Sequence, residues 1–418
     1  MSLGKGAAVL LGRTSKKLLK LLRPAGGSAL PGLIVSKIFP NFLAKSLSQF
    51  PNGIIAISGS AGKSTTTKLV VGILEAHGVK VFTNPSTANI EQGLTTSVID
   101  QASLGGKISA DVAVLEFDEG HGARLAPKLD FKVFTALNVV IDQVDRFDRP
   151  DDVTIMMKKM ALRSDHLVVN ANDESLQPVI DAFRTDFPVT RFGFAVGVIE
   201  AGVLGYLAER DATDLDLTVT KVDGDQLEIA GLAPKSLWFK APARGLHYTV
   251  DTVAAIATAR AYLGEDFDLE KAEMALANVK PVFARSEQLI IRDQQIEFYL
   301  VQNPSSLALN IHTLPESSHL MYIVGSDVRD YSYWWSIDMA PVKQATIVSG
   351  SKAHDAAQHL LYSGVPVHDI EPDVPAAVEK FFSLPILETK PKVIVFSADG
   401  MRRTRKHLGL TQKDGLDG

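Results

Sequence analysis

The sequence predicts an α/β protein built around doubly wound sheets. Short runs of β-branched and other apolar residues recur along the chain, separated by stretches long enough for a helix. A glycine-containing loop with an adjacent lysine and serine follows the first of these runs. The chain has 418 residues, which is too long for one ordinary domain and enough for two or three.

The chain divides into three expected parts. Residues 1–45 form a basic amphipathic segment, residues 46–283 hold a first α/β unit, and residues 284–418 hold a second. A Pro-Ala-Gly-Gly-Ser tract at residues 24–28 ends the first basic stretch, because glycine and proline interrupt a helix.

The N-terminal segment contains cations and leucines but no acidic residue. The first acidic residue of the chain is Glu75, and leucines alternate with lysines and arginines between Val9 and Arg23. Two interpretations remain open: an amphipathic helix docked on the body of the protein, or a helix attracted to an anionic membrane surface. No apolar run reaches the roughly 18 residues that a membrane-spanning helix needs.

Strands and helices alternate from residue 53 onward. In the first unit we expect strands over residues 53–58, 79–82, 111–116, 131–137 and 166–170, with a helix over residues 64–76. Asp223-Gly224-Asp225 predicts a hairpin turn within a region of short strands, residues 192–240. A helix over residues 250–263 precedes the second unit, in which we expect strands over residues 297–301, 320–324 and 393–396.

The loop after the first strand has the composition of a phosphate-binding loop. Glycines allow backbone N–H groups to turn toward an anion, Lys63 can neutralise phosphate oxygens, and the Ser64 hydroxyl can bind Mg²⁺. The strict Walker spacing fails, because its first glycine would fall at Ile57. The nucleotide-binding candidates are Gly59, Ser60, Ala61, Gly62, Lys63, Ser64 and Thr65.

Glu116 is the predicted metal ligand together with Ser64. It ends a buried strand, where open α/β sheets place their binding sites, and Mg²⁺ prefers hard oxygen ligands. Asp118 and Glu119 follow it, so the alternative is a solvated acidic loop. Lys63 and Glu116 are therefore candidate catalytic residues, with ATP and Mg²⁺ as expected ligands.

Composition argues against other classes of function. A net charge of −5 disfavours a general nucleic-acid binder, since such proteins need a clustered basic excess. The absence of cysteine excludes disulfides, thiol catalysis and cysteine-ligated metals, so no structural zinc is expected.

Several stretches resemble the MurT family of Mur-type ligases in sequence and in order. The Gly-x-x-Gly-Lys-Ser-Thr loop at residues 59–65 is similar to that of Mur ligases and folylpolyglutamate synthases. Asp-Gln-Val-Asp-Arg-Phe at residues 142–147 and Arg-Asp-Tyr-Ser at residues 329–332 resemble stretches typical of MurT. The likeness implies a Mur-ligase central P-loop ATPase domain followed by a C-terminal Rossmann-like α/β domain.

The resemblance also implies a reaction. MurT-type subunits use ATP to activate the α-carboxylate of D-glutamate in the lipid II stem peptide as an acyl phosphate. Ammonia from a GatD-like glutaminase, the other half of a heterodimer, then gives D-isoglutamine. A cytoplasmic protein acting at the inner face of the plasma membrane is the corresponding expectation.

Further residues take roles from the same likeness. Asn138, Asp142 and Gln143 match the segment that lies over the γ-phosphate in Mur ligases. Arg285 matches an arginine that reaches the nucleotide phosphates. Asn303 matches part of a Lys-Asn-Pro motif, in which Gln302 replaces the lysine here. Asp330 is the expected aspartate lent to the catalytic histidine of the glutaminase, with Asp327 and Asp338 as alternatives.

The sequence departs from the family in two places. The cysteine zinc ribbon is absent, and Tyr248 and Asp251 lie where the family has asparagines near the adenine. A ligase that adds an amino acid to a carboxylate, as Mur ligases and folylpolyglutamate synthases do, is the alternative enzyme. A non-catalytic nucleotide-binding scaffold is the alternative without chemistry.

Overall fold

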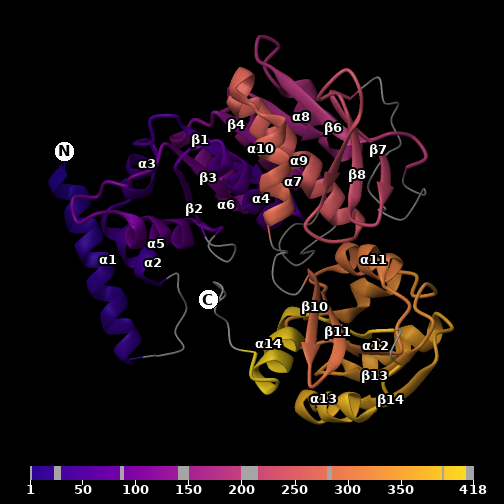
Figure 1. Ribbon diagram of the computed structural model, residues 1–418. Helices are drawn as coiled ribbons and strands as arrows, with labels where there is room; N and C mark the ends of the chain where they lie inside the picture. The colour runs from indigo at the N-terminus through magenta and orange to yellow at the C-terminus, as the bar shows by residue number, and fades with distance from the viewer. Residues whose placement is uncertain are drawn as a thin grey trace.

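Two β-sheets organise the protein. The computed structural model describes residues 2–22, 30–84, 89–139, 150–198, 215–279, 285–387 and 390–410. One sheet has nine strands and the other six, and Figure 1 shows them in separate lobes. The predicted α/β class is confirmed, because most neighbouring strands in both sheets run parallel.

The first sheet has the strand order β2-β3-β1-β4-β5-β6-β7-β8-β9, parallel as far as β7 and antiparallel from there. Its strands are β1 (Ile54–Ser58), β2 (Val81–Thr83), β3 (Val112–Glu116), β4 (Val133–Ala136), β5 (Leu167–Asn170), β6 (Val189–Phe194), β7 (Leu217–Asp223), β8 (Gln226–Ala230) and β9 (Leu237–Lys240). The five strands expected in its parallel part are all present, and the predicted turn joins β7 to β8.

Helices cover both faces of this sheet. Successive residues of β1 point to opposite sides, so Ile54 and Ala56 enter one core while Ile55 and Ile57 enter the other. The second core includes α4 (Lys63–Ala76), α9 (Leu246–Leu263) and α10 (Leu269–Asn278). The first core includes α5 (Glu91–Gln101), α6 (Glu119–Leu125), α7 (Pro150–Ala161) and α8 (Gln177–Ala182). This is the doubly wound arrangement that the sequence predicts.

The N-terminal helices pack on the first lobe. Helix α1 (Ser2–Leu22) lies at its edge against α2 (Leu30–Ile38) and α5, with α3 (Phe42–Leu47) beside them (Figure 1). Ala8 and Val9 of α1 are fully buried. Helix α1 is therefore packed on the body of the protein through this side. Among the described residues, none of the helices is both long and apolar enough to cross a membrane.

The second sheet has the strand order β10-β11-β15-β12-β13-β14, and only β10 and β11 pair antiparallel. Its strands are β10 (Arg285–Ile291), β11 (Gln294–Leu300), β12 (His319–Ile323), β13 (Ala345–Ser349), β14 (Val367–Glu371) and β15 (Lys392–Phe396). One face packs on α11 (Pro304–Thr313), α12 (Ala353–Tyr362) and the short 3₁₀ helix η5 (Tyr331–Ser336), and the other on α13 (Val374–Ser383) and α14 (Ala398–His407).

The expected boundary at residue 283 lies among residues 280–284, outside the described residues. The last helix of the first lobe ends at Asn278, and the first strand of the second sheet begins at Arg285. Helix α11 of the second lobe contacts α9 of the first, so described residues of the two lobes touch there.

Candidate active site

The candidate site lies at the carboxyl ends of β1 and β3. Gly59 and Gly62 have φ angles of +154° and +85°, which residues with a side chain rarely adopt. A Cβ at Gly62 would lie 2.1 Å from Oδ1 of Asp251, so this position also has no room for a side chain. The loop then enters α4 at Lys63, which directs its first backbone N–H groups and the positive end of the helix dipole toward the loop.

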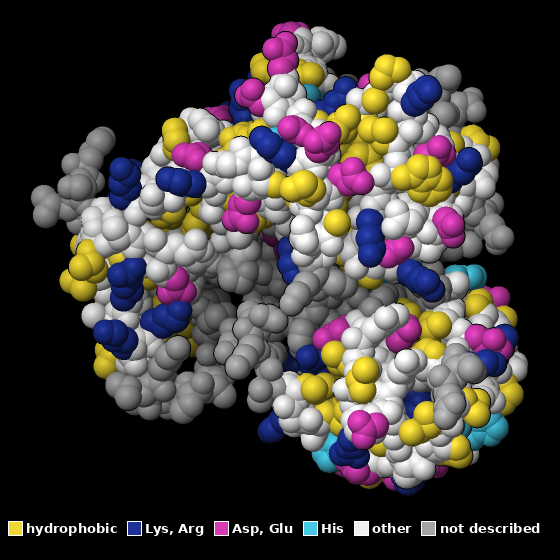
Figure 2. Space-filling model, viewed as in Figure 1, with side chains coloured by type: hydrophobic (Ala, Val, Ile, Leu, Met, Phe, Trp, Pro, Cys, Tyr) yellow, Lys and Arg dark blue, Asp and Glu magenta, His cyan; other side chains and the backbone are white. Residues whose placement is uncertain are grey.

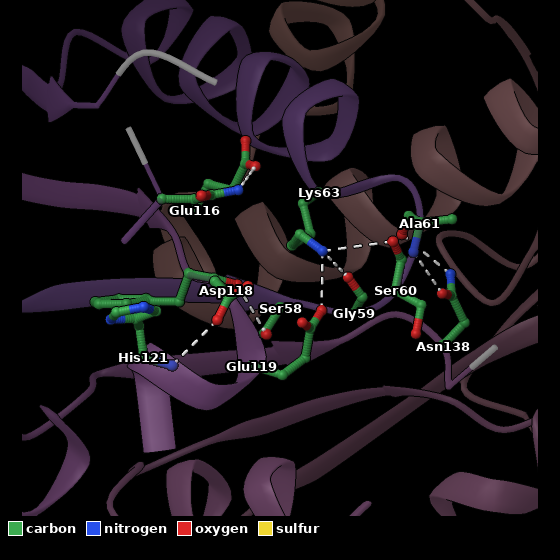
Figure 3. Close-up of polar contacts among 12 residues, drawn as sticks. Ser58, Gly59, Ser60, Ala61, Lys63, Glu116, Asp118, Glu119, His121 and Asn138 are labelled. Atoms are coloured by element: carbon green, nitrogen blue, oxygen red, sulfur yellow. Dashed lines mark hydrogen bonds and ion pairs between the residues drawn. The ribbon is translucent and has the colours of Figure 1, made fainter. Parts of the chain in front are cut away.

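The Lys63 ammonium lies between a carboxylate and loop carbonyls. Its Nζ is 2.8 Å from Oε1 of Glu119 and also donates to the carbonyl oxygens of Gly59 and Ser60 (Figure 3). The side chains of Lys63 and Glu119 are only 14% and 6% exposed. This shielding strengthens the attraction between the two charges relative to a surface pair.

Glu116 is held by residues from three separate segments. The Ser64 hydroxyl donates to its Oε2 at 2.7 Å, and the Asn89 amide donates to its Oε1 at 3.0 Å. Asn84 fixes the backbone of Glu116 by accepting from its N–H and donating to its carbonyl oxygen. The two predicted metal ligands, Ser64 and Glu116, are thus in direct contact.

Asn138, just after the end of β4, forms hydrogen bonds with the phosphate loop. Its side-chain oxygen accepts from the Ala61 N–H at 2.8 Å, and its amide donates to the Ala61 carbonyl at 3.1 Å (Figure 3). The Ser60 N–H donates to the Asn138 backbone carbonyl. Asn138 therefore shapes the phosphate loop through both its side chain and its backbone.

A buried carboxylate holds the backbone that follows Asn138. Asp173 accepts from the Val139 N–H at 2.7 Å and from the Ser175 N–H at 2.9 Å, and it is 1% exposed. Burial raises the pKa of Asp173 to about 6, while these hydrogen bonds oppose the shift.

Helix α9 closes the other side of the loop. The Thr66 hydroxyl donates to Oδ1 of Asp251 at 3.3 Å, which ties the first turn of α4 to α9. Tyr248 is fully buried in the core under the sheet, so it contributes packing at this position.

These residues fit a nucleoside triphosphate with a divalent cation. The loop offers backbone N–H groups and one lysine for phosphate oxygens, and Ser64 and Glu116 offer the hard oxygens that Mg²⁺ prefers. The close approach of Asp251 to Gly62 shows that the tight turn of the loop depends on glycine at this position. No cluster of three or more histidine, cysteine or acidic residues suited to a metal occurs within the described ranges.

Other candidates from the sequence are not joined to this cluster in the described residues. Asp142 and Gln143 lie in residues 140–149, and the side chain of Arg285 likewise lies outside the description. Asn303 is the N-cap of α11 and forms a capping box with Ser306. Its visible role is to begin that helix.

Asp330 lies in the other lobe, on an exposed segment. It is the N-cap of η5 and accepts from the Ser332 N–H at 2.9 Å. Hydrogen bonds from the Ser332 side chain and backbone lower the pKa of Asp330, so it is ionised at neutral pH. Asp327 instead accepts from the Ser397 hydroxyl and the Ala398 N–H at the start of α14.

Exposed aromatic side chains follow Asp330 on η5 and end the neighbouring helix α12. Tyr333, Trp335 and Tyr362 are 48%, 37% and 82% exposed, and the rings of Trp335 and Tyr362 lie 5.4 Å apart. Trp335 also stacks on the buried His359, whose Nδ1 lies 3.1 Å from the Tyr331 hydroxyl. We call Asp330, Tyr333, Trp335 and Tyr362 the aspartate–aromatic patch.

Sequence reasoning missed several residues of the site. Asn84 and Asn89 are not among the site residues that the sequence predicts, and Glu119 is named there only as a neighbour of Glu116. One signal was available: Asn84 directly follows β2 and Glu119 closely follows β3, and parallel strands end at the same edge of a sheet.

Comparison with known proteins identifies relatives that match this chain in sequence. Residues 57–259 match the Mur ligase middle domain family. The chain is 25% identical over 410 residues to the lipid II isoglutaminyl synthase (glutamine-hydrolyzing) subunit MurT of Streptococcus pneumoniae, an alignment that covers 88% of this chain and 89% of that protein. The same subunit from Staphylococcus aureus strain COL is 32% identical over 167 residues, covering 38% of this chain and 37% of that protein.

Solved structures agree on the fold. A pseudomurein peptide ligase type C from Methanothermus fervidus superposes with a TM-score of 0.67 at 17% identity, covering 89% of this chain and 81% of that one. MurF ligase from Thermotoga maritima, in complex with ADP, superposes with a TM-score of 0.65 at 16% identity, covering 90% and 84%. These likenesses confirm the expected combination of a P-loop sheet domain and a second α/β domain.

Proposed function

Since the chain is an ATP-dependent ligase with the Mur ligase fold and a homologue of MurT subunits, we propose that it amidates a lipid-linked peptide carboxylate. The specific substrate is the α-carboxylate of D-glutamate in the lipid II stem peptide, and the product is D-isoglutamine. ATP and Mg²⁺ are the proposed ligands of the loop. The proposed reaction takes place on the cytoplasmic face of the membrane, where both ATP and the lipid-linked acceptor are present.

The reaction has two steps. A carboxylate oxygen of the acceptor attacks the γ-phosphorus of ATP, which gives an acyl phosphate and ADP. Ammonia then attacks the acyl carbon, and inorganic phosphate leaves with the electrons of the broken C–O bond. A carboxylate needs this activation because its own oxygen is a poor leaving group.

The described residues can assist the first step by charge and position. Lys63 stabilises negative charge on the transferred phosphoryl group. Ser64 and Glu116 would hold a divalent cation, which would supply further positive charge there. Asn138 keeps the loop in the shape that directs its N–H groups toward phosphate. Asp173 positions the backbone that leads into residues 140–149, where Asp142 and Gln143 are proposed to reach the γ-phosphate.

One observation carries the proposal. The likeness to the pneumococcal MurT subunit spans both lobes, from the phosphate loop through the segment that holds Asp330. A ligase that shared only its nucleotide-binding domain with MurT would match over the first sheet alone. The amidating reaction is therefore favoured over amino-acid addition.

A glutaminase partner follows from the same likeness, and the aspartate–aromatic patch supports its placement. Asp330 is ionised and exposed, as a residue must be to orient a histidine of a second protein. Tyr333, Trp335 and Tyr362 offer the exposed aromatic area that protein interfaces favour. We therefore propose that the glutaminase docks on this patch and supplies unprotonated ammonia.

The partner claim is tested with the purified pair of proteins and two nitrogen sources. Asp330→Asn should reduce glutamine-driven amidation at least about a hundredfold, while ammonia-driven amidation stays within twofold, because only the histidine of the glutaminase loses its partner. Asp293→Asn is the matched control, an exposed aspartate elsewhere on the same lobe. Equal losses with both nitrogen sources would mean that Asp330 acts in the ligase site instead. No loss with either source would mean that Asp330 is an ordinary surface residue.

A further inference from the structure

Helix α1 has a water-facing side that packing on the protein does not explain. Its inner side uses Ala8, Val9 and Gly12, and a Cβ on Gly12 would lie 2.6 Å from the Ile99 side chain. The opposite side exposes Leu10 and Leu18, which are 57% and 60% exposed. Leu18 follows Leu10 by eight positions, which places the two leucines about 12 Å apart along the helix axis.

The cations of α1 divide into two groups. Arg13 donates to carbonyl oxygens at the end of α5, including that of Ala102, and Lys16 pairs with Asp100 at 2.6 Å. These two cations fasten the helix to the body. Lys17 is exposed next to Leu18 and forms no ion pair among the described residues.

The N-terminal helices contribute cations and no acidic residue to this side of the molecule, and the nearby Asp100 is paired with Lys16. Residues 1–74 contain no aspartate or glutamate. The neighbouring helix α2 ends in exposed Lys37 and Ile38, the latter 57% exposed. Figure 2 shows basic and hydrophobic side chains next to one another along the edge of the molecule where α1 lies.

Exposed apolar side chains elsewhere have different neighbours. Met274 on α10 is 64% exposed, but its helix carries two acidic residues, Glu270 and Glu273, against one lysine, Lys271. An anionic surface would repel that helix, whereas it would attract the outer side of α1. The charge of the surroundings therefore distinguishes the outer side of α1 from the exposed side of α10.

We propose that the outer side of α1, formed by Leu10, Lys17 and Leu18, docks on an anionic lipid bilayer. The two leucines enter the boundary between headgroups and acyl chains, and Lys17 binds lipid phosphate at the depth that its long side chain reaches. The inference rests on the proposed function only for its purpose, which is to bring the ligase to a lipid-linked acceptor.

The test is co-sedimentation of the full chain with vesicles of phosphatidylglycerol and phosphatidylcholine, and with vesicles of phosphatidylcholine alone. Wild type should bind the anionic vesicles and lose binding at high salt. Leu10→Ser with Leu18→Ser should weaken binding at least about tenfold, since less apolar surface enters the bilayer. Lys17→Gln should weaken vesicle binding about fivefold, because that is the usual contribution of one cation near an anionic surface.

Controls separate the surface from the fold and from the reaction. Met274→Ser and Lys235→Gln remove an exposed apolar side chain and an exposed cation elsewhere, and both should bind like wild type. The leucine variant should keep the thermal unfolding profile and the amidation rate of wild type on a detergent-solubilised acceptor. If wild type binds vesicles but does not amidate the acceptor, the proposed function is contradicted while the membrane-docking inference is still supported.

Two results would overturn the inference. One is a wild type that does not sediment with anionic vesicles. The other is a self-association, measured by analytical ultracentrifugation, that the leucine variant abolishes while vesicle binding is unchanged. In that case a second copy of the chain would cover the outer side of α1.

Discussion

The ammonium of Lys63 lies 2.8 Å from the carboxylate of Glu119, at the start of the helix that follows the phosphate loop. The pair joins the first turn of α4 to the first turn of α6. Nucleotide phosphate must share Lys63 with this carboxylate, so Glu119 sets how strongly the loop attracts an anion.

Replacing Glu119 with glutamine is expected to tighten nucleotide binding. The neutral side chain keeps the shape of the site but no longer competes for Lys63, so the dissociation constant of ADP should fall several-fold, about 1 kcal/mol. Isothermal titration calorimetry measures it, with Glu75→Gln as the exposed control. Weaker binding would show instead that Glu119 is needed to position the lysine.

Lys63→Ala should abolish ATP turnover without unfolding the protein. The change removes the side-chain cation described at the loop. Because it also leaves the 6% exposed Glu119 carboxylate without this cation, the thermal midpoint should fall while the protein stays folded. Steady-state ATPase assays and thermal unfolding check the two halves of this prediction. Turnover at the wild-type rate would be incompatible with a phosphate-binding role for this loop.

Glu116→Gln is expected to weaken the dependence on Mg²⁺. The amide keeps an oxygen for the Asn89 or Ser64 contact but carries no charge for the cation, so half-saturation should need about tenfold more Mg²⁺. Titration of activity with Mg²⁺ at saturating ATP measures this. An unchanged titration would remove Glu116 from the metal site.

The parallel strands and the phosphate loop could be predicted from the sequence because their signals are local. β1 is five residues, all buried, and it leads through glycines into Lys63 and Ser64. The order of strands in the second sheet could not be predicted. β15, from the end of the chain, lies between β11 and β12, and only packing between distant segments decides this.

The contacts within the site were harder to predict than its existence. Glu116 contacts Asn84, Asn89 and Ser64, which come from separate segments, and no spacing rule in the sequence joins them. Asp173 could not be predicted either, because nothing in the local sequence reveals that its carboxylate accepts a hydrogen bond from the Val139 N–H. Such contacts depend on the sheet bringing strand ends together.

Asp173 should make stability depend on pH in a defined window. Its pKa is raised from 3.8 to about 6, so its contribution to stability is present below about pH 4 and is lost as pH rises through about 6. The loss should amount to at most about 3 kcal/mol. Denaturant unfolding at several pH values measures it in wild type and in Asp173→Asn, which should lack the dependence. Parallel curves for the two proteins would contradict the assigned pKa.

The first lobe should keep its stability without zinc. The chain has no cysteine, and β7, β8 and β9 are held by antiparallel pairing and by buried side chains such as Leu227 and Phe239. A chelator should therefore leave the thermal midpoint unchanged, and elemental analysis should find no stoichiometric zinc. One zinc per chain with histidine ligands would contradict this expectation.

The fate of an isotopic label tests the central claim most directly. The lipid-linked acceptor is prepared with ¹⁸O in the α-carboxylate of its D-glutamate and incubated with the chain, ATP, Mg²⁺ and ammonia. The proposed reaction predicts a product in which an amino group replaces one carboxylate oxygen, with a single ¹⁸O recovered in inorganic phosphate. A product enlarged by an amino acid, or phosphate without label, would contradict amidation through an acyl phosphate.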